Sequence, residues 1–506
     1  MKKPISFGSI GVELVSSLDG TKASPERETP FTVCIMGDFS GRSSRGIREP
    51  LKNRSPLAID RDTIDEVLKR LRVGIRLDSA GAPLDIAFEC LDDFHPDHLA
   101  ARIDILRVLL GIRRRLGDSR TCNAALKDLH ELTGIATTKP EPSKRGDEKV
   151  QQEGSILDRM LGEAAGSRGV SEPGASLPDL NAFVESVVRP HLVAGKDPER
   201  DRIITALDRA ISGLVAEVMH HETFQSLEAS WRGIQFLVSR VETDEYLKLH
   251  LLDISKDELA ADLMAAENLA LTGTYRLLSR GDVGSEEPWS LIVGDYSFDY
   301  SDAGTLGRLA KIAAAAGAPF ISQADSCLVG CSSLDGSPDP ATWRDLPGRD
   351  TLDVWNDLRH LPEAAYVGLV MPRFLLRLPF GRDTDAAETF DFEEMGDAPV
   401  HTHYLWGNPA FACACLLAQA FSLAGWEMEP GDVSGVDRLP LHVYEEQGAS
   451  GLKPCAEVLL SEKAIDAILD AGIMPLATLK DTDTARLVRF QSIREPLTGL
   501  AGRWDA

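Results

Sequence analysis

The residues best placed to do chemistry in this sequence are a histidine pair and a glutamate, His220, His221 and Glu222, at the start of an amphipathic stretch. A zinc protease helix carries the motif His-Glu-x-x-His, in which two imidazoles one helical turn apart bind the metal and the glutamate acts as general base. Here Gln225 occupies the position of the second histidine. The spacing therefore argues against that zinc site, and it predicts that the histidines lie near the cap of a helix.

Other groupings could bind a metal or a phosphate, and each is incomplete. They are the histidines His401 and His403, the cysteine pairs Cys327 with Cys331 and Cys413 with Cys415, and the glycine-containing stretch from Gly37 to Arg42. A structural zinc needs four ligands, and the cysteine pairs lack a second convincing pair. A phosphate loop needs four residues between its glycines, whereas Gly37 and Gly41 enclose three. The pattern predicts no catalytic residue, no metal site and no cofactor.

Apolar residues recur at intervals of three and four along the stretch HHETFQSLEASWRGIQFLV. These residues, which we call the packing seam, are Phe224, Leu227, Trp231, Ile234 and Val238. The spacing places them along one side of a helix. Glu228 and Arg232 are four positions apart on another face and can form an ion pair. A metal site or a packing surface could begin here, and the seam favours a packing surface centred on Trp231.

Composition narrows the class of protein. The chain has 506 residues, of which 43% are hydrophobic, enough for two or more domains with sizeable cores. A formal net charge of -25 would repel phosphates, which argues against binding to nucleic acid or to an anionic membrane. We expect no N-terminal apolar leader, and no apolar run long enough to span a bilayer. The eight cysteines are scattered through apolar segments, as reduced core thiols would be, and the whole pattern predicts a cytoplasmic protein.

The pattern of apolar residues predicts a mixed α/β fold with two domains and a linker. Residues 1–133 alternate strand and helix patterns, beginning with the buried strand FTVCIMG at 31–37, and predict a small α/β domain. Residues 134–179 are rich in proline, glycine, serine and charge, so they cannot bury a core and predict a flexible linker. Residues 180–506 predict a larger α/β domain.

One apolar island interrupts the linker, at SILDRMLG in 155–162. Ile156, Leu157, Met160 and Leu161 fall on one face of a short helix, for which Ser155 is a candidate N-cap. A short helix within a flexible linker is a common form for a peptide that binds in the groove of a partner. Docking of the helix on its own domain is an equally open alternative.

Many blocks of the sequence, in one order, resemble the large subunit of the contractile sheath of bacterial type VI secretion. They include MHHETFQSLEASWRGIQFLV, GDYSFDY, AAAAGAPFIS, WNDLRHLPEAAYVGLVMPRFLLRLPFG, YLWGNPAFA and KPCAEVLLSEK, between about residues 155 and 490. The N-terminal blocks PFTVCIMGDFSGR and LDIAFECLDDFHPDHLAARI are similar to the small sheath subunit. The chain thus resembles two sheath subunits fused in one polypeptide.

The resemblance implies a structural subunit that polymerises around an inner tube and contracts to propel it. The implied partners are other copies of the chain or separate sheath subunits, an Hcp-like tube protein, a baseplate, and a ClpV-like AAA+ unfoldase that would bind the helix at 155–162. The stretch ISFGSIGVELVSSL would be a linker strand that adds to the sheet of a neighbouring subunit. Its inferred apolar positions are Ile5, Phe7, Ile10, Val12 and Leu14.

The sequence ends at RFQSIREPLTGLAGRWDA, whereas the large sheath subunit continues through a further C-terminal segment. The resemblance therefore leads us to expect that the interlocking of strands between subunits is incomplete without that segment. Two alternatives remain open beside a sheath subunit. One is an accessory or adaptor subunit that joins the sheath without polymerising. The other is a metal-dependent α/β enzyme that would use His220, His221, Glu222 and the pair His401 and His403.

Overall fold

The structure describes most of the chain before residue 133 and most of it after residue 197. In this computed structural model the described residues are 6–10, 29–78, 83–118, 120–132, 198–279, 287–396, 399–446 and 449–505. The predicted linker at 134–179, with its helix at 155–162, lies outside them, as do Ile5, Val12 and Leu14. The domain boundaries predicted at 133 and 180 fall in the same undescribed part of the chain.

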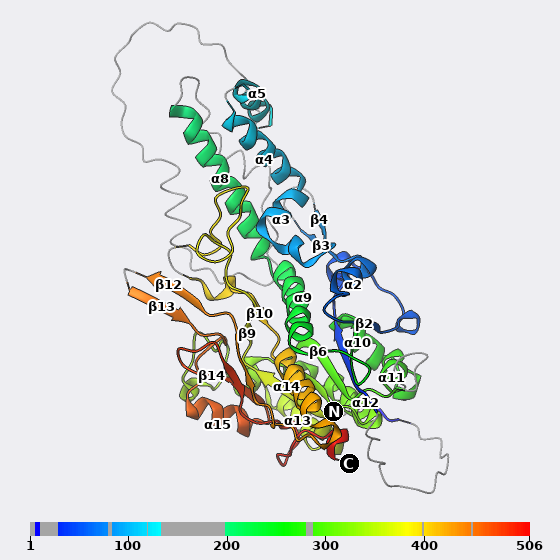
Figure 1. Ribbon diagram of the computed structural model, residues 1–506. Helices are drawn as coiled ribbons and strands as arrows, with labels where there is room; N and C mark the ends of the chain where they lie inside the picture. The colour runs from blue at the N-terminus through cyan, green and yellow to red at the C-terminus, as the bar shows by residue number, and fades with distance from the viewer. Residues whose placement is uncertain are drawn as a thin grey trace, which may run out of the picture.

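A mixed sheet lies at the centre of the molecule (Figure 1). Within the described residues, its nine strands follow the order β11-β15-β14-β8-β7-β6-β1-β5-β2. The strands are β1 Phe31–Gly37, β2 Leu57–Ile59, β5 Leu247–Asp253, β6 Leu291–Phe298, β7 Phe320–Ala324, β8 Val367–Met371, β11 Gly435–Val436, β14 Met474–Thr478 and β15 Ala485–Leu487. The strands from β14 to β5 run parallel, whereas β2, β15 and β11 run antiparallel to their neighbours. The predicted mixed α/β class is confirmed.

Strand β1 lies between β5 and β6, in the interior of this sheet. Phe31 pairs with Leu247 on one side, and Val33 pairs with Leu291 on the other. All seven residues of β1 are buried, as expected for a parallel strand covered on both faces. The region 1–133, which the sequence predicts to be a small α/β domain, therefore shares its central strand with the region after residue 198.

The rest of the N-terminal region is a hairpin and a set of helices. Its elements are α1 Arg42–Arg45, α2 Ile64–Leu71, β3 Gly74–Leu77, β4 Leu84–Ala87, α3 Pro96–Arg102, α4 Asp104–Gly117 and α5 Cys122–Leu132. The stretch after Pro96 divides into two helices because Ile103 adopts an extended conformation. Helices α3, α4 and α5 form an arm with α8, Pro198–Met219, that points away from the sheet (Figure 1). An ion pair between Arg113 of α4 and Asp208 of α8 ties the arm together.

Helices of the second region cover both faces of the sheet. They are α9 Glu222–Arg240, α10 Lys256–Met264, α11 Gly273–Ser279, α12 Ala303–Ala316, α13 Arg349–Arg359, α14 Ala410–Ala424 and α15 Glu462–Asp470. Val33 and Ile35 of β1 face the core that contains α9 and α14. Cys34 and Met36 face the core that contains α10, α11, α12 and α13. The alternation of side chains along one strand thus builds two cores, one on each face of the sheet.

Two short antiparallel pairs and one very apolar helix complete the fold. The pairs are β9 Phe374–Leu375 with β10 Trp406–Gly407, and β12 His442–Glu446 with β13 Ala449–Lys453. The expectation that no apolar run is long enough to span a bilayer is wrong for one window. Among the described residues, Ala410–Glu427 is long and apolar enough to cross a membrane by length and composition. Most of this window is buried inside the molecule, because α14 packs against α9 and the sheet. A helix that is mostly covered by protein favours this composition.

Candidate functional site around helix α9

Helix α9 begins at the histidine pair. His221 is its N-cap, and the Nδ1 atom of His221 accepts a hydrogen bond from the backbone N–H of Thr223 at 3.2 Å. The imidazole of His220 points elsewhere and stacks on the ring of His403, with centroids 3.8 Å apart. The two neighbouring histidines therefore have separate roles, one in capping the helix and one in packing.

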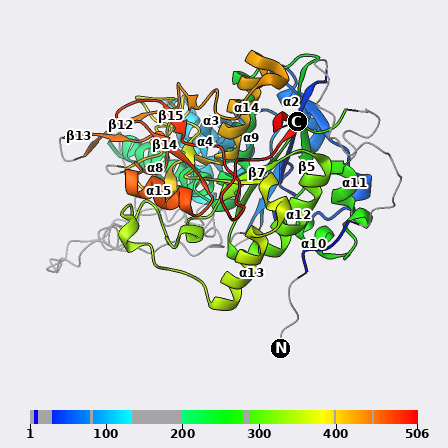
Figure 2. The same ribbon diagram turned by 90° about the horizontal axis from the view of Figure 1, so that it is seen from below.

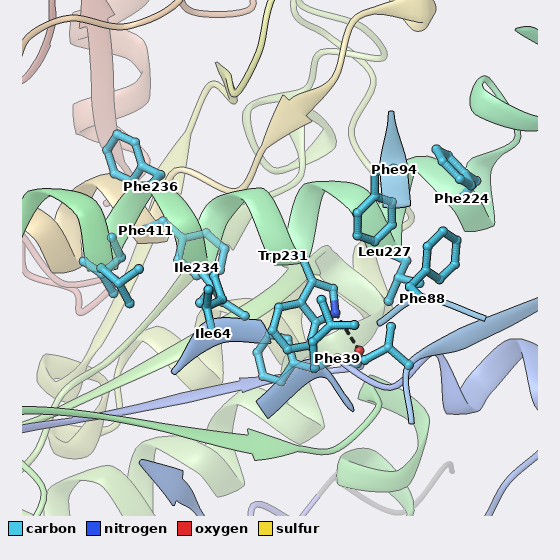
Figure 3. Close-up of a cluster of buried hydrophobic side chains, with 14 of the residues drawn as sticks. Phe39, Ile64, Phe88, Phe94, Phe224, Leu227, Trp231, Ile234, Phe236 and Phe411 are labelled. Atoms are coloured by element: carbon cyan, nitrogen blue, oxygen red, sulfur yellow. Dashed lines mark hydrogen bonds between the residues drawn. The ribbon is translucent and has the colours of Figure 1, made fainter. Parts of the chain in front are cut away.

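The packing seam of α9 faces the N-terminal region (Figure 3). Its five members are all buried. The indole Nε1–H of Trp231 donates a hydrogen bond to the carbonyl oxygen of Phe39 at 2.9 Å, and the two rings meet edge to face with centroids 6.2 Å apart. Phe39 follows strand β1, so this contact joins the start of the chain to a helix almost 200 positions later.

An aromatic cluster continues this interface at the N-terminal end of α9. Phe88 and Phe94 stack with their ring centroids 4.4 Å apart, and both meet the ring of Phe224 at centroid distances of 6.0 and 5.8 Å. Such edge-to-face and offset contacts add to the stabilisation from buried area alone. The packing seam is thus the surface on which the region before residue 133 packs against the region after residue 198.

A buried glycine lets α9 approach α14 closely. A Cβ atom at Gly233 would lie 2.5 Å from Cε2 of Phe411, a distance that real side chains essentially never adopt. At the C-terminal end of α9, the ring of Phe236 contacts the ring of Phe374 with centroids 5.0 Å apart. Helix α9 is therefore enclosed by the N-terminal region along one side and by α14 and β9 along others.

A buried cluster of charges lies on the polar side of α9. The guanidinium of Arg377 donates to both oxygens of Glu228, at 2.7 and 3.0 Å, and to both oxygens of Glu394, at 2.7 and 3.0 Å. Arg232 donates from Nε to Glu228 at 2.7 Å, so the pair predicted from the spacing is present. The backbone N–H of Phe380 also donates to Glu394, at 2.7 Å. We call Glu228, Arg232, Arg377 and Glu394 the charge cluster.

Within the charge cluster, Glu394 and Arg377 favour their ionised forms although both side chains are almost fully buried. Burial alone would raise the pKa of Glu394, but the Arg377 guanidinium and the hydrogen bonds to its carboxylate lower that pKa to about 2. Burial alone would lower the pKa of Arg377, but the two carboxylates outweigh it and raise that pKa. Two carboxylates and two guanidiniums balance, so the cluster is a structural tie between α9 and residues 377–394.

The remaining candidate residues do not assemble into one site. Burial and the neighbouring His220 lower the pKa of His403 to about 4. His401 lies in another cluster, 3.1 Å from an oxygen of Asp335 and 3.3 Å from an oxygen of Glu457. In the described parts of the chain, no group of three or more histidine, cysteine, aspartate or glutamate side chains is arranged to hold a metal ion.

The cysteine pairs are arranged as packing residues. All eight cysteines are free thiols. Burial raises the pKa of Cys327, with help from Asp325, and the pKa of Cys415, in both cases to about 12. Burial raises the pKa of Cys413 as well. Since the thiolate is the form that binds metals and attacks electrophiles, these side chains are held in the unreactive form.

Three aspartates that the sequence pattern does not single out lie on neighbouring strands of the sheet. Asp38 follows β1, Asp253 ends β5, and Asp295 lies within β6. Asp38 and Asp295 line an open cavity of about 490 Å³ together with Ser230 and Lys256. A Gly-Asp pair occurs at the end of β1, in the stretch GDFS, and within β6, in the stretch GDYS, and this repeated signal could have located the cavity from sequence. The carboxyl ends of parallel strands are where α/β folds gather polar groups.

Asp295 costs stability at neutral pH, and its replacement should reveal this cost. Burial raises the pKa of this carboxyl to about 6, although the hydroxyl of Ser230 donates to it at 2.5 Å, and the negative charge of Asp38 adds to the rise. The folded state therefore binds a proton more tightly than the unfolded state, and this advantage is lost as the pH rises through 6. We expect Asp295→Asn to increase the free energy of unfolding by about 1–2 kcal/mol at pH 7.5.

The increase should shrink when urea unfolding is repeated at pH 4.5, because the native carboxyl is then already neutral. Replacing the exposed Asp357 with asparagine is the matched control. An equal gain for Asp295→Asn at both pH values would contradict a raised pKa as the cause.

Comparisons with known proteins match both regions of the chain. Residues 201–494 match the family model described as EvpB/VC_A0108, tail sheath N-terminal domain. Residues 11–134 match the family model described as Type VI secretion system, VipA, VC_A0107 or Hcp2. The packing seam lies within the second region, 201–494, and packs against residues of the first, 11–134, so the interface around Trp231 joins two regions with different relatives.

Two curated relatives show the same division. Over 306 residues the chain is 37% identical to the type VI secretion system sheath protein TssC1 of Pseudomonas aeruginosa, which covers 58% of this chain and 61% of that protein. Over 101 residues it is 30% identical to the sheath protein TssB1 of the same organism, which covers 19% of this chain and 58% of that protein. The chain spans about three fifths of the length of each of these relatives.

Proposed function

Since this chain belongs to the family described as EvpB/VC_A0108, tail sheath N-terminal domain, we propose that it is a structural subunit of a type VI secretion contractile sheath. The single observation that supports this most is the position of β1 between β5 and β6. The region similar to VipA and the region in the sheath family share one sheet and one core. The fused chain is therefore one protomer in which two sheath subunits are joined.

Fusion has a physical advantage for such a protomer. Covalent linkage turns the association of two subunits into a step within one molecule, at an effective concentration set by the connection between them. The packing seam and the aromatic cluster of Phe88, Phe94 and Phe224 then form in cis. On this proposal the side chains of α9 hold the protomer together, and the charge cluster serves the same purpose rather than catalysis.

The proposed partners follow from the sheath function. Other copies of the chain would repeat along the polymer, an Hcp-like tube would lie inside it, and a baseplate would start it. A ClpV-like unfoldase would bind the helix at 155–162 through Ile156, Leu157, Met160 and Leu161, residues that lie outside the described part of the chain. The proposed location of the assembly is the cytoplasm, and we propose no enzymatic activity and no binding of nucleic acid.

Negative-stain electron microscopy of the purified chain tests the proposal directly. We expect hollow tubes, either from the chain alone or after mixing with the proteins encoded beside it. Tubes that form only after mixing would mean that a partner chain supplies part of the sheath lattice. Absence of tubes under both conditions, with circular dichroism showing a folded protein, would favour the adaptor role instead. Tubes that persist after addition of the unfoldase and ATP would contradict the proposed role of the helix at 155–162.

A further inference from the structure

Residues 6–10 cross the surface of their own chain beside helix α12, near α10 (Figure 2). The backbone N–H of Ser9 donates to the carbonyl oxygen of Glu267 at 2.9 Å, and the backbone N–H of Leu269 donates to the carbonyl oxygen of Ser9 at 2.8 Å. Ser9 therefore forms a parallel bridge with Asn268. Phe7 and Ile10, which the family resemblance implies would pair with a neighbouring subunit, pack here against the core below α12.

The ring of Phe7 occupies a notch that only glycine can provide. A Cβ atom at Gly307 would lie 2.1 Å from Cδ1 of Phe7. Gly307 is buried within α12, where glycine costs about 1 kcal/mol relative to alanine. The fit of the phenyl ring gives a physical reason for a glycine at this position.

Gly8 is required in the same way on the other side of the contact. Its φ of 73° lies in the left-handed region that favours glycine. A Cβ atom at Gly8 would also lie 3.0 Å from Nη1 of Arg308 and 3.1 Å from the carbonyl oxygen of Glu267. One glycine in the segment and one in the helix thus allow the two to approach closely.

Two cationic side chains of α12, Arg308 and Lys311, donate hydrogen bonds to the main chain of residues 6–10. The buried Arg308 donates from Nη2 to the carbonyl oxygen of Ser6 at 3.0 Å, and it is held by an ion pair with Glu267 at 3.0 Å. Lys311 donates from Nζ to the carbonyl oxygen of Gly8 at 2.5 Å. Residues 6–10 are thus hydrogen-bonded through their main chain on both edges, and the ring of Phe7 fills the notch at Gly307. These contacts define a recess on the surface of the molecule. We call Glu267–Leu269, Gly307, Arg308 and Lys311 the recess.

We propose that the recess is a binding site for residues 6–10 and that it withholds this segment from a second copy of the chain. The inference rests on the proposed function, because the competing acceptor is a neighbouring sheath subunit. Residues 11–28 join the segment to β1. Eighteen residues can span at most about 60 Å, so a released segment can reach beyond its own protomer. Docking in cis and pairing in trans then compete for the same five residues.

Hydrogen exchange of the full chain, below the concentration at which it assembles, tests the recess. We expect Gly307→Ala to expel Phe7 and to speed exchange at the Leu269 amide about tenfold or more, since that amide loses its acceptor on Ser9. The matched control is Gly111→Ala in α4, where an added Cβ atom meets nothing. In the double variant Phe7→Ala with Gly307→Ala, the clash is absent, and exchange at Leu269 should be slower than in Gly307→Ala alone. Unchanged exchange at Leu269 in Gly307→Ala would overturn the proposal.

Sedimentation of the same variants tests whether the recess keeps residues 6–10 from pairing with a second copy of the chain. We expect Gly307→Ala to assemble at a concentration about threefold or more lower than Gly111→Ala, because its segment is no longer held in cis. If the two variants assemble at the same concentration while the natural chain forms tubes, the recess does not compete with pairing between copies. That result would overturn this part of the proposal and leave the proposed sheath function intact. Failure of the natural chain to form tubes would instead count against the sheath function, and the exchange at Leu269 would still report on the recess.

Discussion

Replacing Arg377 with methionine should lower the free energy of unfolding by about 3–5 kcal/mol, because it removes the cation between two buried carboxylates. Glu228 and Glu394 each receive two hydrogen bonds from this one guanidinium, and both side chains are almost fully buried. Without Arg377, Glu394 must become protonated or draw in water. Urea unfolding followed by far-ultraviolet circular dichroism at pH 7.5 measures the loss.

A surface ion pair provides the control for this prediction. Arg382 pairs with Asp391 at 3.4 Å, and 75% and 71% of their side-chain surfaces are exposed. Replacing Arg382 with methionine should change stability within the range of about 0–1 kcal/mol that is typical of exposed pairs. The double variant Arg377→Met with Glu394→Gln should recover part of the loss, because Glu228 keeps its ion pair with Arg232 and no buried carboxylate is then left unpaired. Equal losses for Arg377→Met and Arg382→Met would show that burial of the charge cluster does not matter.

Replacing Trp231 with alanine should also cost about 3–5 kcal/mol, because the cavity opens between the two regions of the chain. The indole is fully buried, fills the space beside Phe39, and donates a hydrogen bond to the carbonyl oxygen of Phe39. The loss should appear as a lower urea midpoint with an unchanged slope, since both regions would still unfold together.

Trp343 is the matched control for Trp231. Its indole also donates to a backbone carbonyl oxygen, that of Ser337 at 2.8 Å, but the side chain is only partly buried. We expect Trp343→Ala to cost less than half as much as Trp231→Ala, because less apolar area leaves water at that position. A small effect of Trp231→Ala would mean that the N-terminal region packs on α9 without depending on the seam.

Local elements were predictable from the sequence because each carries its own signal. The run FTVCIMG predicts the buried strand β1, and the spacing of the packing seam predicts helix α9 with histidines near its cap. The ion pair of Glu228 with Arg232 was also predictable, since residues four positions apart on a helix lie side by side. Each of these features depends on residues a few positions apart in the sequence, so the local pattern of residue types is enough to predict it.

The arrangement of the elements was not predictable in the same way. A strand buried on both faces shows an apolar run that carries no information about which strands lie beside it, so the sequence alone places β1 with residues 1–133 and not beside β5 and β6. Arg377 joins the charge cluster from 149 positions beyond Glu228, and no local spacing connects them. The stacking of His220 on His403 likewise joins residues that are far apart in the sequence, and no local spacing predicts it. The proposed sheath function rests on family resemblance, whereas the shared sheet required the structure.

The interior position of β1 sets the order in which the molecule can be completed during synthesis. The strand leaves the ribosome first, yet its partner Leu247 lies 216 positions after Phe31, and β6 follows later still. At about 5–20 residues per second, translation takes roughly 10–40 s to supply the first of these neighbours. During that time an apolar strand with two unsatisfied edges is exposed on the nascent chain, so chaperone binding to FTVCIMG should be a normal stage in the biogenesis of this protein.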